Sequence, residues 1–365
     1  MYTYKFRIYP DKETTKLLIR WFGYSRYVWN WGLERKTKYH KETGKFLLYL
    51  QLAKELTLLK KERTWLKEAP SQALQQVLKQ LETAFARFFE KKSRYPKFKS
   101  KKHFTQSLQI PQGFKIEDNK LYLPKLRKKP IKIKLHREVK GNIKRIIVSI
   151  NKINQFFVSI ITDYIPKKLP KSNKKTGIDL GLKHFLITSD GRKIPLPKWF
   201  KKSENLIKWV QRKLSRKQKG SKRHEKTRQR LAKLQLKISN QRLDFLHKLS
   251  KLLIDENQVI AVESLNIKGM IKNHRLAKYI ANASWGKFLE LLKYKAEWYG
   301  RTVLEVNRFA PTSKMCNKCG YIKKDLKLSD RTWTCPRCGT FHDRDINAAK
   351  NIIELALTTA GTAGS

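Results

Sequence analysis

The sequence predicts an α/β protein with more than one domain, and three observations lead to this expectation. The spacing of apolar residues alternates along the chain between a period of two, which is typical of strands, and a period of 3.6, which is typical of helices. Residues 166–175 contain prolines and lysines without periodicity, which indicates an exposed linker. Hydrophobic residues make up 40% of the 365 positions, so the chain can build cores in two or three domains.

Before the linker, the pattern predicts a strand, then helices, then more strands. Residues 2–9 alternate as a strand and Pro10 ends it. Residues 11–103 are expected to form a helical domain that ends in a basic loop, because two apolar stripes with helical spacing lie within them. Residues 104–165 show period-two runs separated by turn signals. We therefore expect residues 1–10 and 104–165 to form a small antiparallel barrel or sheet that the helical domain interrupts.

After the linker, the pattern predicts short strands followed by long helices. The expected elements are strands at 176–180, 185–188 and 193–196, a basic helical region at 201–251, a strand at 259–262, a helix at 284–299, a strand at 302–306, a cysteine-rich insertion and a last helix at 346–357. Residues 358–365 are small and polar and are expected to form a flexible tail. Three antiparallel strands that feed a sheet flanked by helices follow the element order of the ribonuclease H fold.

The charge balance predicts an anionic partner. The chain has 83 Lys and Arg against 29 Asp and Glu, a formal net charge of +54, which excludes a cationic partner surface. The basic residues are spread over the whole length and are not gathered on one amphipathic helix, so nucleic acid is favoured over a membrane surface. The sequence has no apolar stretch of membrane-spanning length and no signal peptide, so a soluble cytoplasmic protein is expected.

Three acids stand where the predicted fold would bring them together: Asp179 in the first strand after the linker, Glu263 at the end of the fourth, and Asp345 at the start of the last helix. An unpaired carboxylate inside an apolar strand costs several kcal/mol unless a metal or another partner satisfies it. Mg²⁺ suits such oxygen ligands, and two ions ~3.5–4 Å apart can hydrolyse a phosphodiester. Taken singly, each acid has another explanation: Asp179 as a turn former, Glu263 as a helix cap and Asp345 as an N-cap.

The four cysteines, Cys316, Cys319, Cys335 and Cys338, form two Cys-x-x-Cys pairs separated by fifteen residues. This spacing predicts one structural Zn²⁺ held by four thiolates, because no ligand position is left for a water. Catalytic zinc and redox chemistry are the alternatives. A further candidate is a basic segment with interleaved aromatic residues, which is typical of contacts with phosphates and unpaired bases: Arg94, Tyr95, Lys97, Phe98 and Lys99.

Several motifs resemble those of the TnpB family, the RNA-guided nucleases encoded by insertion sequences, also called OrfB, which are related to type V CRISPR effectors. Gly-Ile-Asp-Leu-Gly-Leu at 177–182, Val-Glu-Ser-Leu-Asn-Ile at 262–267 and His-Asp-Arg-Asp-Ile-Asn-Ala-Ala-Lys-Asn-Ile at 342–352 resemble the three RuvC motifs of that family. Pro-Thr-Ser-Lys-Met-Cys-Asn-Lys-Cys-Gly at 311–320 resembles its zinc ribbon. The likeness covers essentially the full chain.

The resemblance implies a domain plan and a set of site residues. Residues 1–10 and 104–165 would form a wedge β-barrel interrupted by a helical recognition domain at 11–103, followed by the linker at 166–175. Residues 176–309 and 341–357 would form a RuvC-like nuclease domain, with a zinc ribbon at 310–340 and a flexible tail at 358–365. Asp179, Glu263 and Asp345 would bind two catalytic Mg²⁺ ions, Asp343 being the less favoured acid, and Arg344 would contact the scissile phosphate.

The resemblance also implies the partners and the reaction. The protein would bind, as a monomer, a guide RNA derived from the transposon end. It would recognise a short motif that flanks the target and cleave double-stranded DNA with its single Mg²⁺-dependent RuvC site. No membrane is expected as a partner, and the protein would be prokaryotic, cytoplasmic and associated with the nucleoid when bound to DNA. A transposase that joins strands and a catalytically silent RNA-guided repressor are the alternative functions.

Overall fold

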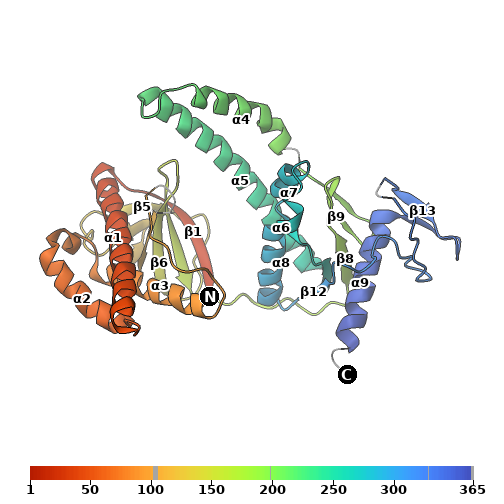
Figure 1. The fold of residues 1–365 in the computed structure, drawn as a ribbon, viewed down its shortest axis with the longest axis horizontal. Helices are drawn as coiled ribbons and strands as arrows, with labels where there is room; N and C mark the ends of the chain where they lie inside the picture. The colour runs from red at the N-terminus through yellow and green to blue at the C-terminus, as the bar shows by residue number, and fades with distance from the viewer. Residues whose placement is uncertain (102–105, 198, 328, 363–365) are drawn as a thin grey trace. The chain divides into compact units, whose positions relative to one another are not determined.

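The computed structural model describes all residues except 102–105, 198, 328 and 363–365. The chain divides into two compact units, Met1–Ile165 and Pro166–Ser365 (Figure 1). The division falls at the start of the expected linker. Each unit has its own hydrophobic core, so the units are described separately.

The helices of the first unit are α1 (Lys12–Thr43), α2 (Tyr49–Glu62), a 3₁₀ turn (Thr64–Glu68) and α3 (Ser71–Phe89). Helix α1 begins at Asp11, whose side chain accepts a hydrogen bond from the Thr14 amide, and it ends at Gly44, which adopts a left-handed conformation. Gly32 allows α1 and α3 to approach closely, because a Cβ atom at this position would lie 2.9 Å from Leu78 Cδ2.

The strands of the first unit are β1 (Tyr2–Tyr9), β2 (Gln106–Ile110), β3 (Lys115–Glu117), β4 (Lys120–Tyr122), β5 (Ile131–Lys134), β6 (Ile143–Ile150) and β7 (Phe156–Thr162). They form one sheet in the order β2-β6-β7-β1-β5-β4-β3. The N-terminal strand pairs antiparallel with β7 and β5, which confirms that the helices are an insertion between strands of one sheet. The expected barrel is corrected to an open sheet: within the described residues no pairing joins β2 to β3, because each of these short end strands has a single neighbour.

The second unit is built on a mixed sheet of five strands: β8 (Lys175–Asp179), β9 (His184–Thr188), β10 (Lys193–Pro195), β11 (Val259–Glu263) and β12 (Thr302–Val306). The order is β10-β9-β8-β11-β12, with β10, β9 and β8 antiparallel and β8, β11 and β12 parallel. The carboxyl ends of β8 and β11 therefore lie side by side at one edge of the sheet.

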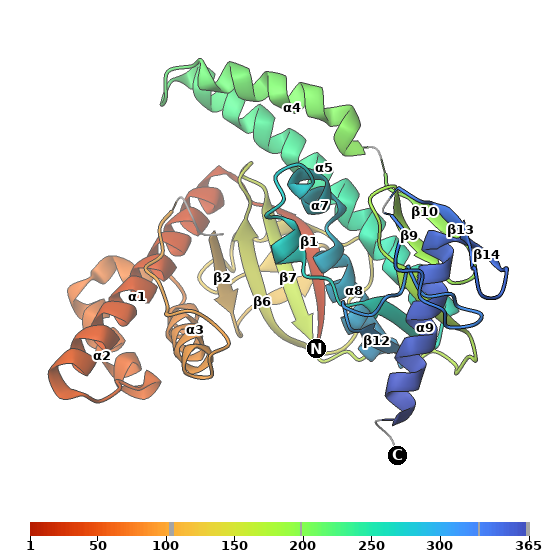
Figure 2. The same cartoon turned by 45° about the vertical axis from the view of Figure 1, so that its right-hand side comes forward.

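The helices of the second unit are α4 (Trp199–Ser215), α5 (Lys222–Glu256), α6 (Ile267–Met270), α7 (Ala277–Ala283), α8 (Trp285–Tyr299) and α9 (Arg344–Thr362). They cover both faces of the sheet (Figure 2). Ile260 and Val262 of β11 pack into the core shared with α5 and α8, whereas Ala261 between them packs with α9. Since side chains alternate across a strand, α9 covers the opposite face from α5 and α8.

Two expectations about the end of the chain are modified. Helix α9 continues to Thr362, so residues 358–362 are helical where a tail was expected; residues 363–365 lie outside the described part. Strand β14 (Phe341–Asp343), placed with the nuclease domain by the resemblance, pairs with β13 (Thr332–Thr334) of the cysteine-rich insertion. A search of the helices in the described residues finds none with the length and apolar character needed to cross a membrane.

Candidate active site and metal centre

Strand alternation brings the predicted acids to one face of the second sheet. Asp179 and Glu263 are the last residues of the adjacent parallel strands β8 and β11. Gly177 and Ala261, two residues before them, face α9, so both carboxylates point to the α9 side. Asp345 lies in the first turn of α9. The three acids therefore come from three elements that meet at the carboxyl edge of the sheet.

Gly177 makes this meeting possible because it allows α9 to lie against β8. A Cβ atom at position 177 would lie 1.9 Å from the Ala349 carbonyl oxygen and 2.9 Å from the Ile353 amide nitrogen. Any side chain larger than hydrogen would therefore push the helix away from the strand, and Asp345 with it.

The acids influence one another electrostatically. Burial, followed by repulsion from Asp345 and Glu263, raises the pKa of Asp179 to about 7, while Arg344 opposes the shift. Burial also raises the pKa of Glu263. Burial and mutual repulsion disfavour the charged form of these carboxyl groups, so a cation bound at this edge would be favoured.

The three carboxylates do not form a closed cage for one metal ion within the described residues. Among the described residues, the four cysteines are the one group of three or more His, Cys, Asp or Glu side chains close enough to hold a single ion. Mg²⁺ does not require such a cage, because it usually keeps waters and phosphate oxygens in its shell.

The helix caps near these acids are other residues. The Asp343 carboxylate accepts hydrogen bonds from the amides of Asp345 (3.1 Å) and Ile346 (3.2 Å) and pairs with Lys193 Nζ at 2.6 Å. Asn266 caps α6, the helix that follows Glu263. Asp343 and Asn266 therefore do the capping that was considered for Asp345 and Glu263.

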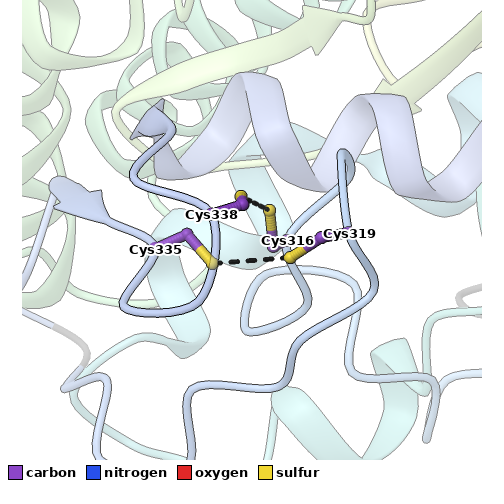
Figure 3. A group of neighbouring side chains, drawn as sticks. All are labelled: Cys316, Cys319, Cys335 and Cys338. Carbon is purple, nitrogen blue, oxygen red and sulfur yellow. Dashed lines mark hydrogen bonds between the residues drawn. The ribbon is translucent and has the colours of Figure 1, made fainter.

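The four cysteines converge as their spacing predicted (Figure 3). One ligand sulfur from each lies within 4.8 Å of the others, and the Cys316–Cys338 and Cys319–Cys335 sulfurs are 3.6 Å apart. Each Cys-x-x-Cys pair closes into the same turn: the Gly320 amide donates to the Cys316 carbonyl and the Gly339 amide to the Cys335 carbonyl, both at 2.9 Å. Both glycines have positive φ, which makes the turns possible.

The cysteine-rich insertion is tied to α9 by buried side chains. Asn351 Nδ2 donates to the carbonyls of Thr312 (2.7 Å) and Met315 (2.6 Å), and Asn347 Nδ2 donates to the Met315 carbonyl at 2.7 Å. His342 is buried with its Nε2 3.1 Å from the Cys316 sulfur. Asn347 and Asn351 were not among the residues predicted from the sequence, although two asparagines four residues apart on an apolar helix face are an unusual pattern that indicates a polar partner.

Arg344 is also held by the insertion. Its side chain is buried, and its Nη1 donates to the Lys327 carbonyl at 2.8 Å. The guanidinium therefore anchors the insertion in this structure, and a contact between Arg344 and a phosphate stays a prediction.

The predicted nucleic-acid segment lies along α1 in the first unit. Trp29 Nε1 donates to the Lys97 carbonyl at 3.0 Å, and the Lys99 ammonium lies 3.5 Å from the centre of the Trp29 ring. Burial lowers the pKa of Lys99 to about 8. Tyr95 packs edge-on against aromatic rings of α3, whereas the side chains of Arg94, Lys97 and Phe98 are exposed. Tyr95 and Lys99 thus help to fix the segment, and Arg94, Lys97, Phe98 and the exposed part of Tyr95 are available to a partner.

Three family models match parts of the chain. Residues 1–45 match a helix-turn-helix domain of OrfB proteins, residues 148–274 match the OrfB family described as "Probable transposase", and residues 285–352 match a TNB domain like that of Cas12f1. Within residues 1–45 the structure contains one strand and one continuous helix, without the turn that the first description implies.

Similar proteins cover nearly the whole chain. A protein of Streptomyces pristinaespiralis named "Putative RNA-guided DNA endonuclease" is 36% identical over 98% of this chain and 90% of that relative. InsQ of Escherichia coli K12, which carries the same description, is 31% identical over 96% of this chain and 91% of the relative. Among solved structures, the Cas12f1 chain in a complex with sgRNA and target DNA superposes with a TM-score of 0.60 at 16% identity, covering 94% of this chain and 83% of that one.

Proposed function

Because the chain belongs to the TnpB (OrfB) family of insertion-sequence proteins, we propose that it is an RNA-guided DNA endonuclease. The observation that carries the proposal is the meeting of Asp179, Glu263 and Asp345 at one edge of a five-stranded sheet, where burial and mutual repulsion raise the pKa of Asp179. The strand order and the helices on both faces support a ribonuclease H-like (RuvC) nuclease domain.

In this proposal the three carboxylates hold two Mg²⁺ ions. When bound, such ions supply an activated water and stabilise the leaving oxygen of a phosphodiester, giving 5′-phosphate and 3′-hydroxyl ends. The chain's own contribution is to fix the acids on three rigid elements. Asp343 supports the arrangement by capping α9 and by pairing with Lys193, which keeps Asp345 in the first turn of the helix.

The four cysteines would hold one structural Zn²⁺. Four soft thiolate ligands in two tight turns fit zinc and leave no position for a reacting water. The hydrogen bonds from Asn347 and Asn351 would then connect the zinc ribbon to α9 and support the helix that carries Asp345.

The proposed partners are a guide RNA and a target DNA with a short flanking motif. The formal net charge of +54 supports binding to both. Base pairing to the guide would select the sequence, while the protein recognises the flanking motif and backbone shape, as in other guided nucleases. A monomer with its RNA and the exposed Arg94, Lys97 and Phe98 as contacts belong to the same proposal.

The decisive experiment uses the protein purified with the RNA that copurifies with it. Plasmid DNA complementary to the variable end of that RNA, flanked by randomised sequence, is incubated with the complex and Mg²⁺. Wild type should cut, and Asp179→Ala should bind the same plasmid without cutting it. Asp190→Ala serves as the matched control, because Asp190 lies in the turn between β9 and β10 of the same unit and pairs with Arg192. Guided binding without cleavage by wild type, or cleavage by Asp179→Ala, would refute the nuclease proposal.

The description of the family as "Probable transposase" favours one other candidate, strand joining at the same acids. Incubation with transposon-end DNA and Mg²⁺ distinguishes the two, because a transposase gives joined products whereas a nuclease gives only cuts.

A further inference from the structure

Helices α4 and α5 form a long antiparallel hairpin in the second unit (Figures 1 and 2). We call residues 203–242 of this hairpin the arm. In both views, the closed end of the arm lies away from the five-stranded sheet of the same unit. The catalytic edge proposed above makes no use of the arm.

The arm is held together by its own contacts. Val210 of α4 and Ile238 of α5 are buried. At the closed end, Ser221 caps α5 by accepting a hydrogen bond from the His224 amide, and Lys217 Nζ contacts the Thr227 hydroxyl at 2.7 Å. A helix pair with a buried seam and a capped turn is a stiff support for the charges on its surface.

The arm carries a large uncompensated positive charge. It contains fourteen Lys and Arg but only two acids, a net formal charge of +12. Both acids are already paired, Glu204 with Lys208 and Lys278, and Glu225 with Arg228. The side chains of twelve cations are exposed: Lys208, Arg212, Lys213, Arg216, Lys219, Lys222, Arg223, Lys226, Arg228, Arg230, Lys233 and Lys237.

Five of these cations follow one face of α5 and form what we call the stripe: Lys222, Lys226, Arg230, Lys233 and Lys237. Steps of three and four residues place successive members about 5–6 Å apart on one side of a helix. Like charges at this spacing destabilise an isolated helix by about 0.2–0.5 kcal/mol per pair, and an anionic partner would relieve this repulsion.

The length of the stripe matches the backbone of a duplex. The fifteen residue-to-residue steps from Lys222 to Lys237 correspond to about 22 Å of helix at ~1.5 Å per step. Duplex DNA presents one negative charge per ~1.7 Å of its axis, so roughly 13 phosphates lie along this length. A straight row of cations on a stiff hairpin suits a straight, regular backbone better than a flexible single strand.

The connections of the arm favour the target DNA over the guide RNA as this partner. Helix α4 follows strand β10, and α5 leads directly into β11, which ends at Glu263. Because the arm is inserted in the sequence between the strands that end at Asp179 and at Glu263, its partner is expected to be the nucleic acid on which these acids act.

Resting on the proposed function, we propose that the stripe binds the sugar–phosphate backbone of the target DNA while the acids act on it. The contact is electrostatic and independent of base sequence. Its expected signature is therefore in the salt dependence of DNA binding and not in the choice of target.

The test compares three RNA-loaded proteins: wild type, a stripe variant with all five cations changed to glutamine, and a control with five glutamines elsewhere in the unit. Glutamine has nearly the helix propensity of lysine, so α5 should persist, which circular dichroism checks. The control removes the same charge from exposed positions outside the arm: Lys171, Lys174, Lys272, Arg275 and Lys324. Binding to matched duplex DNA is measured between 50 and 200 mM salt.

We expect the slope of log K against log salt, which is negative, to become shallower by about 4 to 5 in the stripe variant, at ~0.9 per lost phosphate contact. The control variant should change the slope by less than half of this amount. Affinity for the copurifying RNA alone should be unchanged in the stripe variant.

An unchanged slope in the stripe variant overturns the proposal, as does an equal loss in the control. Loss of RNA affinity with normal DNA binding by the loaded protein also overturns it, because the stripe would then belong to the guide. A wild-type complex with no preference for matched DNA would instead refute the proposed function, and the slopes on unmatched duplex would still decide whether the stripe binds DNA.

Discussion

Replacing Asp179 by asparagine should stabilise the metal-free protein at neutral and alkaline pH. The pKa of Asp179 is raised from an ordinary value of 3.8 to about 7 by burial and by the neighbouring acids. The folded protein therefore retains a proton that the unfolded chain releases between pH 4 and 7. Stability conferred by this group falls as pH rises through that window and stays low above it. Asparagine resembles the protonated carboxyl and removes the penalty.

The size of the effect follows from the same shift. A difference of about three pH units at ~1.4 kcal/mol each gives an upper value of ~4 kcal/mol. Asp179 is half-buried, so solvent screens part of the repulsion and we expect about half of this amount. For a unit of this size, ~2 kcal/mol corresponds to a rise of about 4–8 °C in the midpoint of thermal unfolding.

The assay is thermal unfolding of wild type and Asp179→Asn in EDTA at pH 5 and pH 8. The variant should gain several degrees over wild type at pH 8 and less at pH 5. Added Mg²⁺ should raise the wild-type midpoint more than that of the variant, because the ion neutralises the carboxylate that asparagine lacks. The reasoning would be refuted if the variant were no more stable than wild type at pH 8. It would also be refuted if Mg²⁺ raised the unfolding midpoint of the variant as much as that of wild type.

Asp343→Asn is the control, because the pKa of Asp343 is lowered where that of Asp179 is raised, and its effect on stability should have the opposite sign. Burial alone would raise the pKa of Asp343, but hydrogen bonds from Lys193 and from the amides at the start of α9 outweigh it and lower the pKa. The stability that Asp343 confers is therefore present at neutral pH and is lost as the solution is acidified. Asp343→Asn should destabilise at pH 8, and the loss should shrink toward pH 4.

Three further changes test the geometry around the acids. Gly177→Ala should destabilise the second unit by ~1–3 kcal/mol and abolish cleavage, since the methyl group would collide with the Ala349 carbonyl; urea unfolding and a cleavage assay measure both. Cys335→Ser should abolish stoichiometric zinc binding, measured by metal analysis, and expose residues 310–340 to protease. Asn351→Ala leaves the carbonyl of the buried Thr312 without this donor, while the Met315 carbonyl keeps Asn347. A cost of ~1–3 kcal/mol should speed zinc release to a chelator by roughly tenfold or more, and an unchanged rate would contradict the link between the insertion and α9.

Local pattern was sufficient for many elements of the fold. The alternation at residues 2–9 and the change of period after Pro10 correctly predicted a strand followed by an inserted helical segment, because burial of one face imposes its period on the sequence. Pattern failed where the outcome depends on partners distant in sequence. The closure of a barrel depends on whether β2 meets β3, and neither strand's sequence encodes that meeting.

The candidate sites show the same division. Cysteine spacing predicted the convergence of the four thiols because two Cys-x-x-Cys turns nearly determine their own geometry. The acids could be selected only jointly, and Asp345 and Asp343, two residues apart, could not be distinguished by composition. The structure separates them: Asp343 is occupied as a cap and by Lys193, while Asp345 repels Asp179.

The amino-acid sequence by itself predicted an anionic class of partner, the cluster of four cysteines and the periods of the helices and strands, because charge and side-chain alternation are properties of local composition. Only the tertiary structure decided which acids confront one another, through the parallel pairing of β8 with β11 and the close approach of α9 at Gly177. It also decided that Asn347 and Asn351 join the cysteine insertion to that helix. These contacts join residues tens to more than a hundred positions apart, and their energies arise only when the packed elements bring the groups within reach.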